Sequence, residues 1–236
     1  MLDAEIQALL FDFNGTLCDD APELVRIYRQ VTQEAGLPLP DNLIPAVMGL
    51  SDTDVFSQLL RAAGLPPDDR QVAVLTGRRR ELYRQSMASS PPITAARRKI
   101  LQNLAARVPL GVVSGAFSHE IRAVLTAAGI DDVFTAVVAI DDVVRGKPDP
   151  EGWLLALAKI NDRLEQPIPP DRVLAVDDSA DGLRAARHAG MLTAAVSNGV
   201  TPSPQAEADL VLGALNQDAE AALLAAIKNT APHRDR

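Results

Sequence analysis

The sequence predicts an α/β protein in which helices cover a parallel sheet and an all-helical segment is inserted after the first strand. Residues 6–11 form a near-continuous apolar run, which is typical of a parallel strand buried on both faces. Residues 20–90 carry helical patterns with no strand pattern between them, which indicates an inserted small domain. From residue 92 onward, short apolar runs alternate with helical segments, and this alternation indicates a parallel sheet.

The elements of the sheet region follow from the hydrophobic pattern. Each expected strand is a short apolar run, and each expected helix carries apolar residues at helical spacing. After the first run, we expect strands at Leu110–Val113, Val133–Ile140, Arg172–Val176, Leu192–Val196 and Asp209–Leu212. We expect helices at Thr94–Ala106, Ser118–Ala128, Pro150–Ile160, Gly182–Ala189 and Asn216–Lys228, followed by a frayed tail at 232–236.

The inserted segment opens with the signals of a helix start. Asp20 offers a carboxylate cap, Pro22 suits the first turn, and Gly36 ends the apolar stripe that follows. Further helices are expected at Asp41–Met48, Asp52–Ala63 and Asp68–Met87. We therefore expect a small helical domain at 20–90 and a core domain made of residues 1–19 and 91–236.

Composition limits the classes of function. The 236-residue chain carries a net charge of −8, which argues against a nucleic-acid groove because phosphates demand clustered Lys and Arg. No apolar run approaches the ~18 residues of a membrane span, and the acidic N-terminus lacks the pattern of a signal peptide. Cys18 has no second cysteine with which to form a disulfide, which fits a reducing compartment. We expect a cytoplasmic monomer or homodimer that binds neither nucleic acid nor membrane.

Polar side chains follow four of the expected strands. Asp12 ends the first, Ser114 follows the second, Lys147 comes after the third, and the pair Asp177-Asp178 ends the fourth. In open α/β sheets, ligands bind outside the carboxyl ends of the strands, so these side chains are expected at one site. Each motif alone also fits ordinary turn or helix-cap chemistry. Their occurrence in this order is the observation that favours a site.

Two adjacent carboxylates at the end of a buried strand point to a metal. Asp177 and Asp178 repel each other unless a cation or hydrogen bonds hold them. Mg²⁺ takes oxygen ligands and keeps water molecules in its remaining positions, so it would satisfy the pair. The alternative is that the pair only caps the helix that follows.

These motifs, with a helical insertion between the first and the second, resemble those of the haloacid dehalogenase-like phosphohydrolase superfamily. The resemblance covers about residues 1–230 and is to the branch with a helical cap, which includes phosphoglycolate phosphatases and β-phosphoglucomutases. It implies a Rossmann-like core, an inserted cap, and Mg²⁺-dependent hydrolysis of a small phosphorylated metabolite through an aspartyl-phosphate. It assigns Asp12 as the nucleophile, Lys147 as its partner and a phosphoryl ligand, Ser114 and Gly115 as phosphoryl-binding residues, and Asp12, Asp177, Asp178 and the backbone carbonyl of Asn14 as metal ligands.

One position departs from the family's Asp-x-Asp-Gly-Thr motif, because Asn14 stands where the second aspartate is usual. That aspartate protonates the leaving oxygen and activates the attacking water, which an amide cannot do. Three interpretations follow. In the first, the substrate has a leaving group that needs no acid, as in an acyl phosphate. In the second, Asp19 or Asp20 takes over the acid–base role. In the third, turnover is slow or absent. A replacement introduced to trap a complex is also left open.

Other activities of this scaffold are disfavoured by particular residues. Residues 21–90 contain no lysine, which excludes phosphonate chemistry through a Schiff base, and the retained acidic pair argues against dehalogenation. A phosphosugar mutase would have an arginine where Asp52 stands. Arg80 is taken as a cap residue that faces the ligand, although the run Arg78-Arg79-Arg80 also fits a solvated helix face. The sequence thus predicts a phosphatase with a weakened or rerouted acid–base step; a phosphometabolite-binding or regulatory protein is the alternative.

Overall fold

The computed structural model describes residues 5–37, 50–89, 92–197 and 208–227. Six parallel strands form one sheet in the order β3-β2-β1-β4-β5-β6. The strands are β1 (Ala8–Phe11), β2 (Leu110–Val113), β3 (Ala136–Val138), β4 (Val173–Asp177), β5 (Leu192–Ala195) and β6 (Leu210–Val211). β1 is central and pairs with β2 on one side and β4 on the other. The strand order therefore reverses beside β1, the kind of position at which α/β proteins bind ligands.

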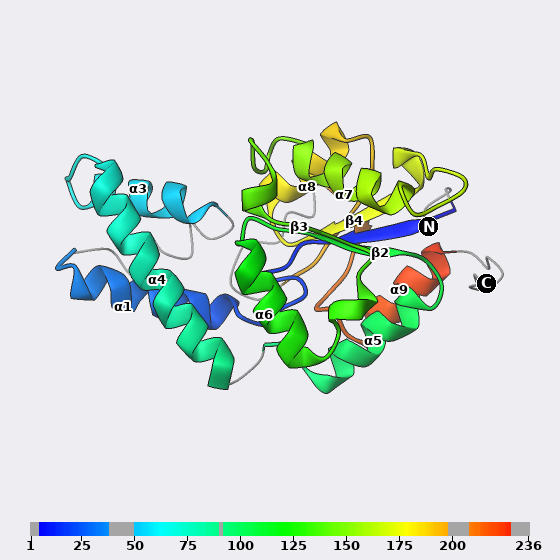
Figure 1. The fold of residues 1–236 in the computed structure, drawn as a ribbon, viewed down its shortest axis with the longest axis horizontal. Coiled ribbons are helices and arrows are strands. Elements are labelled where there is room, and N and C mark those ends of the chain that lie inside the picture. The colour runs from blue at the N-terminus through cyan, green and yellow to red at the C-terminus, as the bar shows by residue number, and fades with distance from the viewer. Residues whose placement is uncertain (1–4, 38–49, 90–91, 198–207, 228–236) are drawn as a thin grey trace.

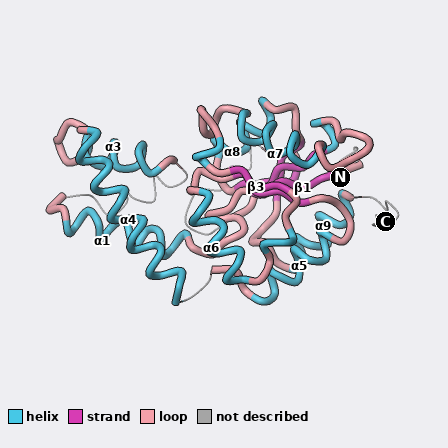
Figure 2. The backbone as a smooth tube through the Cα atoms, viewed as in Figure 1, coloured by secondary structure: helices cyan, strands magenta, loops and turns pink. Residues whose placement is uncertain are grey.

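Helices cover both faces of this sheet (Figures 1 and 2). The helices α7 (Glu151–Asn161) and α8 (Ala180–His188) lie on one face, and α5 (Ala95–Ala105), α6 (Ser118–Ala128) and α9 (Gln217–Ala226) lie on the other. Successive side chains of a strand point to opposite faces. Leu9 and Phe11 of β1 accordingly pack into one hydrophobic cluster, whereas Ala8 and Leu10 pack into the other. All the apolar residues of this run are buried, as a strand covered on both sides requires.

Three helices of the inserted segment form a separate unit beside the sheet, which we call the cap (Figure 1). It consists of α1 (Ala21–Glu34), α3 (Asp52–Ala62) and α4 (Asp69–Ser89), and α4 packs against both of the others. Tyr28 of α1 meets Phe56 of α3 edge to face at 5.4 Å between ring centroids. The predicted class, a parallel Rossmann-like sheet with a helical insertion, is confirmed. The helix expected at 41–48 lies outside the described residues, and the domain limits near 20 and 90 stay a prediction.

The expected strand at Val133–Ile140 is shorter than predicted. β3 spans only Ala136–Val138, between short 3-10 turns at Asp131–Val133 and Ile140–Asp142. β3 lies at the edge of the sheet and pairs with β2 alone, so its length follows that of β2. Beyond it, the side chain of Asp142 accepts a hydrogen bond from the Ala139 N–H and turns the chain. The apolar run in the sequence therefore extends beyond the residues of β3 that can form hydrogen bonds with β2.

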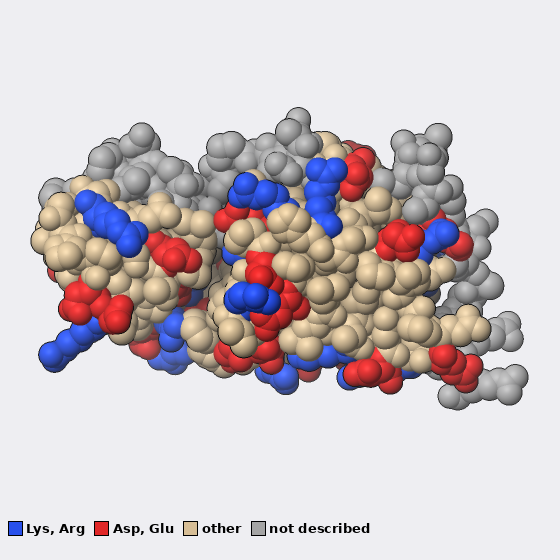
Figure 3. Space-filling model, turned by 90° about the horizontal axis from the view of Figure 1, so that it is seen from above, with Lys and Arg blue, Asp and Glu red and all other residues tan. Residues whose placement is uncertain are grey.

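The charges of the molecule are spread over its surface. In the view of Figure 3, basic and acidic side chains alternate over the cap and the core, and no continuous basic track crosses the described part of that face. Within the described residues, no helix combines the length and the apolar character that crossing a lipid bilayer requires.

Candidate active site

Asp12 stands directly after β1, at the start of a tight loop. Its N–H continues the sheet by donating to the Val176 carbonyl at 2.8 Å. The loop then folds on itself through Gly15, whose φ of 80° is a left-handed conformation that glycine adopts without strain. The Gly15 and Cys18 N–H groups donate to the carbonyls of Cys18 and Phe13, which closes the turn. This geometry holds the Asp12 carboxylate at the carboxyl edge of the sheet.

A buried arginine fixes the far end of the same loop. Arg97 of α5 is 5% exposed, and its guanidinium donates to the Leu17 carbonyl at 3.1 Å and to the Asp19 carboxylate at 2.9 Å. A third hydrogen bond runs from Arg97 Nε to the Leu215 carbonyl at 3.4 Å. The planar guanidinium thus connects the loop to α5 and to the chain before α9.

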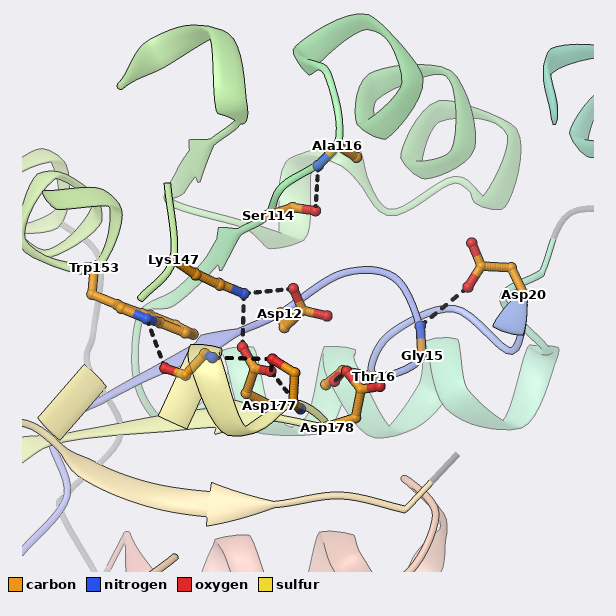
Figure 4. Close-up of polar contacts among 12 residues, drawn as sticks. Asp12, Gly15, Thr16, Asp20, Ser114, Ala116, Lys147, Trp153, Asp177 and Asp178 are labelled. Carbon is orange, nitrogen blue, oxygen red and sulfur yellow. Dashed lines mark hydrogen bonds and ion pairs between the residues drawn. The ribbon is translucent and has the colours of Figure 1, made fainter. Parts of the chain in front are cut away.

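Lys147 joins two of the four strand ends (Figure 4). Its Nζ donates to Asp12 Oδ1 at 2.6 Å and to Asp177 Oδ2 at 2.7 Å. It also lies 4.9 Å from the centroid of the Trp153 ring. Burial alone would lower the pKa of Lys147, but the carboxylates of Asp12 and Asp177 outweigh this effect and raise that pKa. The side chain is therefore an ammonium held between two carboxylates.

Asp177 and Asp178 lie at the carboxyl end of β4, just before α8. Asp177 Oδ1 accepts from the N–H and the hydroxyl of Ser179, at 2.8 and 2.7 Å, so its orientation is fixed from the helix side. Asp178 Oδ1 accepts from the Thr16 hydroxyl at 3.3 Å. Gly182 is required beneath Asp177, because a Cβ there would lie only 2.0 Å from Asp177 Oδ2. A side chain at Gly182 would displace the carboxylate that holds Lys147.

Asp12, Asp177 and Asp178 together offer a cation site. One carboxylate oxygen from each lies within 4.8 Å of the others, and all three residues are buried. Burial raises the pKa of Asp12 to about 7, against the effect of Lys147. Burial also raises the pKa of Asp178, and the carboxylates of Asp12 and Asp177 add to this. Three carboxylates thus share one ammonium, and a hard dication that prefers oxygen ligands fits this donor set.

Ser114 and Gly115 follow β2 and line the same cavity as Asp12 and Lys147. The Ser114 N–H donates to the Val138 carbonyl at 3.0 Å, which extends the sheet by one residue. The Ser114 hydroxyl oxygen accepts from the Ala116 N–H at 3.0 Å, so its own hydrogen is free to be donated elsewhere (Figure 4). The structure therefore brings all four predicted strand ends to one cavity.

The side chain of Asn14 turns to the cap rather than to Lys147. Its Nδ2 donates to Asp20 Oδ2 at 2.5 Å and to the Tyr83 hydroxyl oxygen at 3.2 Å. Asp20 is 1% exposed and also accepts from Tyr83 Oη at 2.7 Å and from the Gly15 N–H at 3.1 Å. Burial raises the pKa of Asp20, although the hydrogen bonds from Tyr83 and Asn14 oppose it. Asn14 is thereby held by a network that reaches α4.

A cavity of about 120 Å³ separates the strand ends from the cap. Tyr28, Ser51, Asp52 and Arg79 line it from the cap, opposite the residues of the sheet edge. Arg80 is absent from the described lining; its guanidinium lies 3.6 Å from the centroid of the Phe117 ring. The arginine of the run Arg78-Arg79-Arg80 that reaches the cavity is Arg79.

Sequence reasoning did not single out Arg79, Tyr83 or Glu120. A usable signal existed for the first two, because Arg79 and Tyr83 stand at helical spacing from the apolar Val72 and therefore share its buried face of α4. Glu120 is a buried acid on α6, and only the packing of α6 against α4 reveals its role.

The sequence is similar to those of known hydrolases. A family model described as haloacid dehalogenase-like hydrolase matches residues 6–190. The phosphorylated carbohydrates phosphatase of Thermotoga maritima is 25% identical over 187 residues, which cover 79% of this chain and 82% of that protein. The N-acetylmuramic acid 6-phosphate phosphatase of Pseudomonas aeruginosa is 30% identical over 199 residues, which cover 82% of this chain and 83% of that protein.

The fold has solved counterparts. The crystal structure of β-phosphoglucomutase from Clostridium difficile matches with a TM-score of 0.78 over 94% of this chain and 97% of that one, and its 19% identity makes this a likeness of fold alone. The family model, in contrast, covers most of the sequence, from before β1 to the end of α8. The chain therefore belongs to the haloacid dehalogenase-like hydrolase family.

Proposed function

We propose that this protein is a Mg²⁺-dependent phosphatase that hydrolyses a phosphorylated carbohydrate through an aspartyl-phosphate on Asp12. The observation that best supports this proposal is that Lys147 contacts both Asp12 and Asp177 at the strand ends. The third carboxylate, Asp178, lies beside them. The substrate class is inferred from relatives, among them the Thermotoga maritima phosphatase that is named for phosphorylated carbohydrates.

The proposed reaction has two displacements at phosphorus. An Asp12 oxygen attacks the phosphoryl group, a bond from Asp12 to phosphorus forms, and the bond to the sugar oxygen breaks. The sugar oxygen takes its proton from water, because the Asn14 amide has none to give. Water then attacks the aspartyl-phosphate and gives one proton to the solvent, the bond to Asp12 breaks, and inorganic phosphate leaves. Lys147 holds Asp12 in position and offers its charge to the phosphoryl oxygens, while Ser114 donates a hydrogen bond to one of them.

Asp12, Asp178 and the Asn14 backbone carbonyl would hold the metal, with Asp177 as a direct or water-mediated ligand. When bound, Mg²⁺ supplies positive charge against the phosphoryl oxygens and against the carboxylates. Asp177 Oδ1 already accepts hydrogen bonds from Ser179, and Asp177 Oδ2 accepts one from Lys147. The main contribution of Asp177 is therefore to orient Lys147.

Metal dependence tests this proposal and separates it from the alternative of a phosphometabolite-binding protein, which Asn14 favours. Phosphate release from acetyl phosphate and from sugar phosphates is measured with Mg²⁺ and with EDTA. We expect release with Mg²⁺ and a loss of at least about 100-fold with EDTA, because unscreened carboxylates repel the dianion. Stabilisation against thermal unfolding by a sugar phosphate without any release would instead indicate a binding protein.

Asn14→Asp is expected to raise the hydrolysis of an alkyl phosphate such as glucose 6-phosphate by at least about tenfold, since general acid–base catalysis is typically worth ~10²–10⁴. The introduced carboxyl would meet Asp20, which now accepts from Asn14 at 2.5 Å, and the two would share one proton. Acetyl phosphate, whose leaving group needs no acid, should gain little. Steady-state rates for both compounds are compared.

Asn14→Ala is the matched control, because it removes the amide without adding an acid. The companion Asn14→Asp with Asp20→Asn keeps the introduced carboxylate and gives it an amide partner. Equal rates for wild type and Asn14→Asp on glucose 6-phosphate would show that proton transfer at this position does not limit the reaction.

A further inference from the structure

Arg79 is a buried cation on the cap side of the cavity, yet its charge is already matched. Its guanidinium Nη1 donates to both carboxylate oxygens of Glu120, at 3.0 and 3.2 Å. Its Nε lies 3.3 Å from Asp52 Oδ1, an ion pair in which Nε makes no hydrogen bond. Arg79 is 4% exposed, and all three residues line the cavity. Two carboxylates therefore surround one guanidinium in the wall opposite the phosphoryl site.

This arrangement is fixed by its neighbours. The Tyr28 hydroxyl donates to Asp52 Oδ1 at 2.6 Å, and the Arg79 guanidinium carbon lies 4.7 Å from the centroid of the Tyr83 ring. Both tyrosines are buried. If Arg79 turned to a second ligand, Glu120 would lose its hydrogen bonds from the guanidinium and Asp52 would keep only the one from Tyr28, a change that is costly where water is excluded.

The other described cations of the cavity wall also lie beside two carboxylates each, although the Arg145 side chain is 70% exposed and its ion pairs are therefore weaker. Arg145 lies 3.0 Å from Asp149 and 3.7 Å from Glu151, and Lys147 is shared by Asp12 and Asp177. Residues 38–49, which precede the wall residues Leu50 and Ser51, contain no lysine or arginine in their sequence. Each described cation of the wall therefore faces two carboxylates, and that segment cannot add another cation.

Building on the proposed phosphatase function, we propose that Asp52 and Glu120 determine specificity by selecting phosphate monoesters of neutral polyols and excluding leaving groups that carry a second anion. Carboxylates accept hydrogen bonds from hydroxyl groups, so the wall suits a polyhydroxylated chain. A carboxylate or second phosphate at the same place would be brought out of water against like charges with no unmatched cation to pair with. The wall discriminates mainly by repulsion.

A matched pair of ligands tests the inference. Sorbitol 6-phosphate and 6-phosphogluconate have the same chain length and differ at the far carbon, which is a neutral hydroxymethyl in one and a carboxylate in the other. Binding to Asp12→Asn protein with Mg²⁺ is measured by calorimetry, so that turnover does not interfere. We expect sorbitol 6-phosphate to bind at least about tenfold more tightly. Equal binding, tighter binding of 6-phosphogluconate, or no binding of either overturns the inference.

Substitutions of Asp52 and Glu120 test whether these two carboxylates cause the binding preference. In the Asp12→Asn background, Glu120→Gln and Asp52→Asn keep the shape of the side chain and remove one charge. In each variant, the ratio of the two dissociation constants (6-phosphogluconate to sorbitol 6-phosphate) should fall at least about fivefold, mainly because 6-phosphogluconate binds more tightly. Glu81→Gln, on the exposed face of α4 where Glu81 pairs with Arg84, is the matched control and should leave the preference unchanged. An unchanged ratio in both wall variants would overturn their assignment as specificity residues.

The two proposals fail separately. If wild-type protein with Mg²⁺ releases no phosphate from acetyl phosphate or from either sugar phosphate, the phosphatase function is wrong. The binding preference of the Asp12→Asn protein then still decides the specificity of the cavity.

Discussion

Asp12→Asn is expected to abolish phosphatase activity, with a loss of at least ~10⁴-fold in the rate of phosphate release. An amide of the same shape cannot form the aspartyl-phosphate, and loss of a covalent nucleophile removes the whole two-step route. The fold should survive, because Lys147 keeps Asp177 as a partner at 2.7 Å. Phosphate release in single-turnover experiments with acetyl phosphate, the compound that least needs acid catalysis, measures the loss.

A trapped analogue provides the independent check. Wild-type protein with Mg²⁺ should form a fluoroberyllate adduct on the Asp12 carboxylate, visible by fluorine NMR, and Asp12→Asn should not. Circular dichroism and thermal unfolding of both proteins control for the fold. If Asp12→Asn keeps activity within about tenfold of wild type, the nucleophile lies elsewhere.

Lys147→Met is expected to lower the rate by ~10³-fold or more. The substitution keeps a long apolar stem beside Trp153 but removes the ammonium that lies 2.6 Å from Asp12 and 2.7 Å from Asp177. Asp12 and the incoming phosphoryl group would then face each other without that cation, and preorganised charge is usually the largest part of catalysis. The value of kcat/KM for acetyl phosphate at saturating Mg²⁺ measures the effect.

Lys99→Met is the matched control, because Lys99 is an exposed residue of α5 that does not line the cavity, so its loss should leave the rate unchanged. Lys147→Arg separates charge from geometry. Its planar guanidinium cannot place one nitrogen against both carboxylates as an ammonium does, so we expect little rescue. Full activity in Lys147→Arg would mean that net charge alone, rather than its position, supports the reaction.

The centre of the sheet could be predicted because β1, β2 and β4 are buried along their whole length. The expected bounds of β2 and α6 agree with the structure, and most other elements end within one or two residues of the expected positions. The edge strand β3 was predicted too long, since the apolar pattern records burial and not the length of the neighbouring strand. The convergence of Asp12, Ser114, Lys147 and Asp177 followed from the rule that parallel strands end at one edge.

Contacts between elements could not be predicted from the sequence. The helical spacing places Arg79 on the buried face of α4, but its partner Glu120 is revealed only by the packing of α4 against α6. The partnership of Asn14 with Asp20 and Tyr83 also depends on where the cap sits. A sequence motif shows which residues lie at the end of a strand, but tertiary packing decides which side chains of other elements contact them.

The distribution of the acidic cluster along the chain has a consequence for how the protein matures. Asp12 belongs to the first strand, whereas Asp177 and Asp178 belong to the fourth, and these strands are adjacent in the finished sheet. The magnesium affinity that we propose should therefore appear only after residue 178 of the 236 has been synthesised and the first and fourth strands have paired. A nascent or truncated chain that ends before β4 would lack two of the three carboxylates of the proposed cation site.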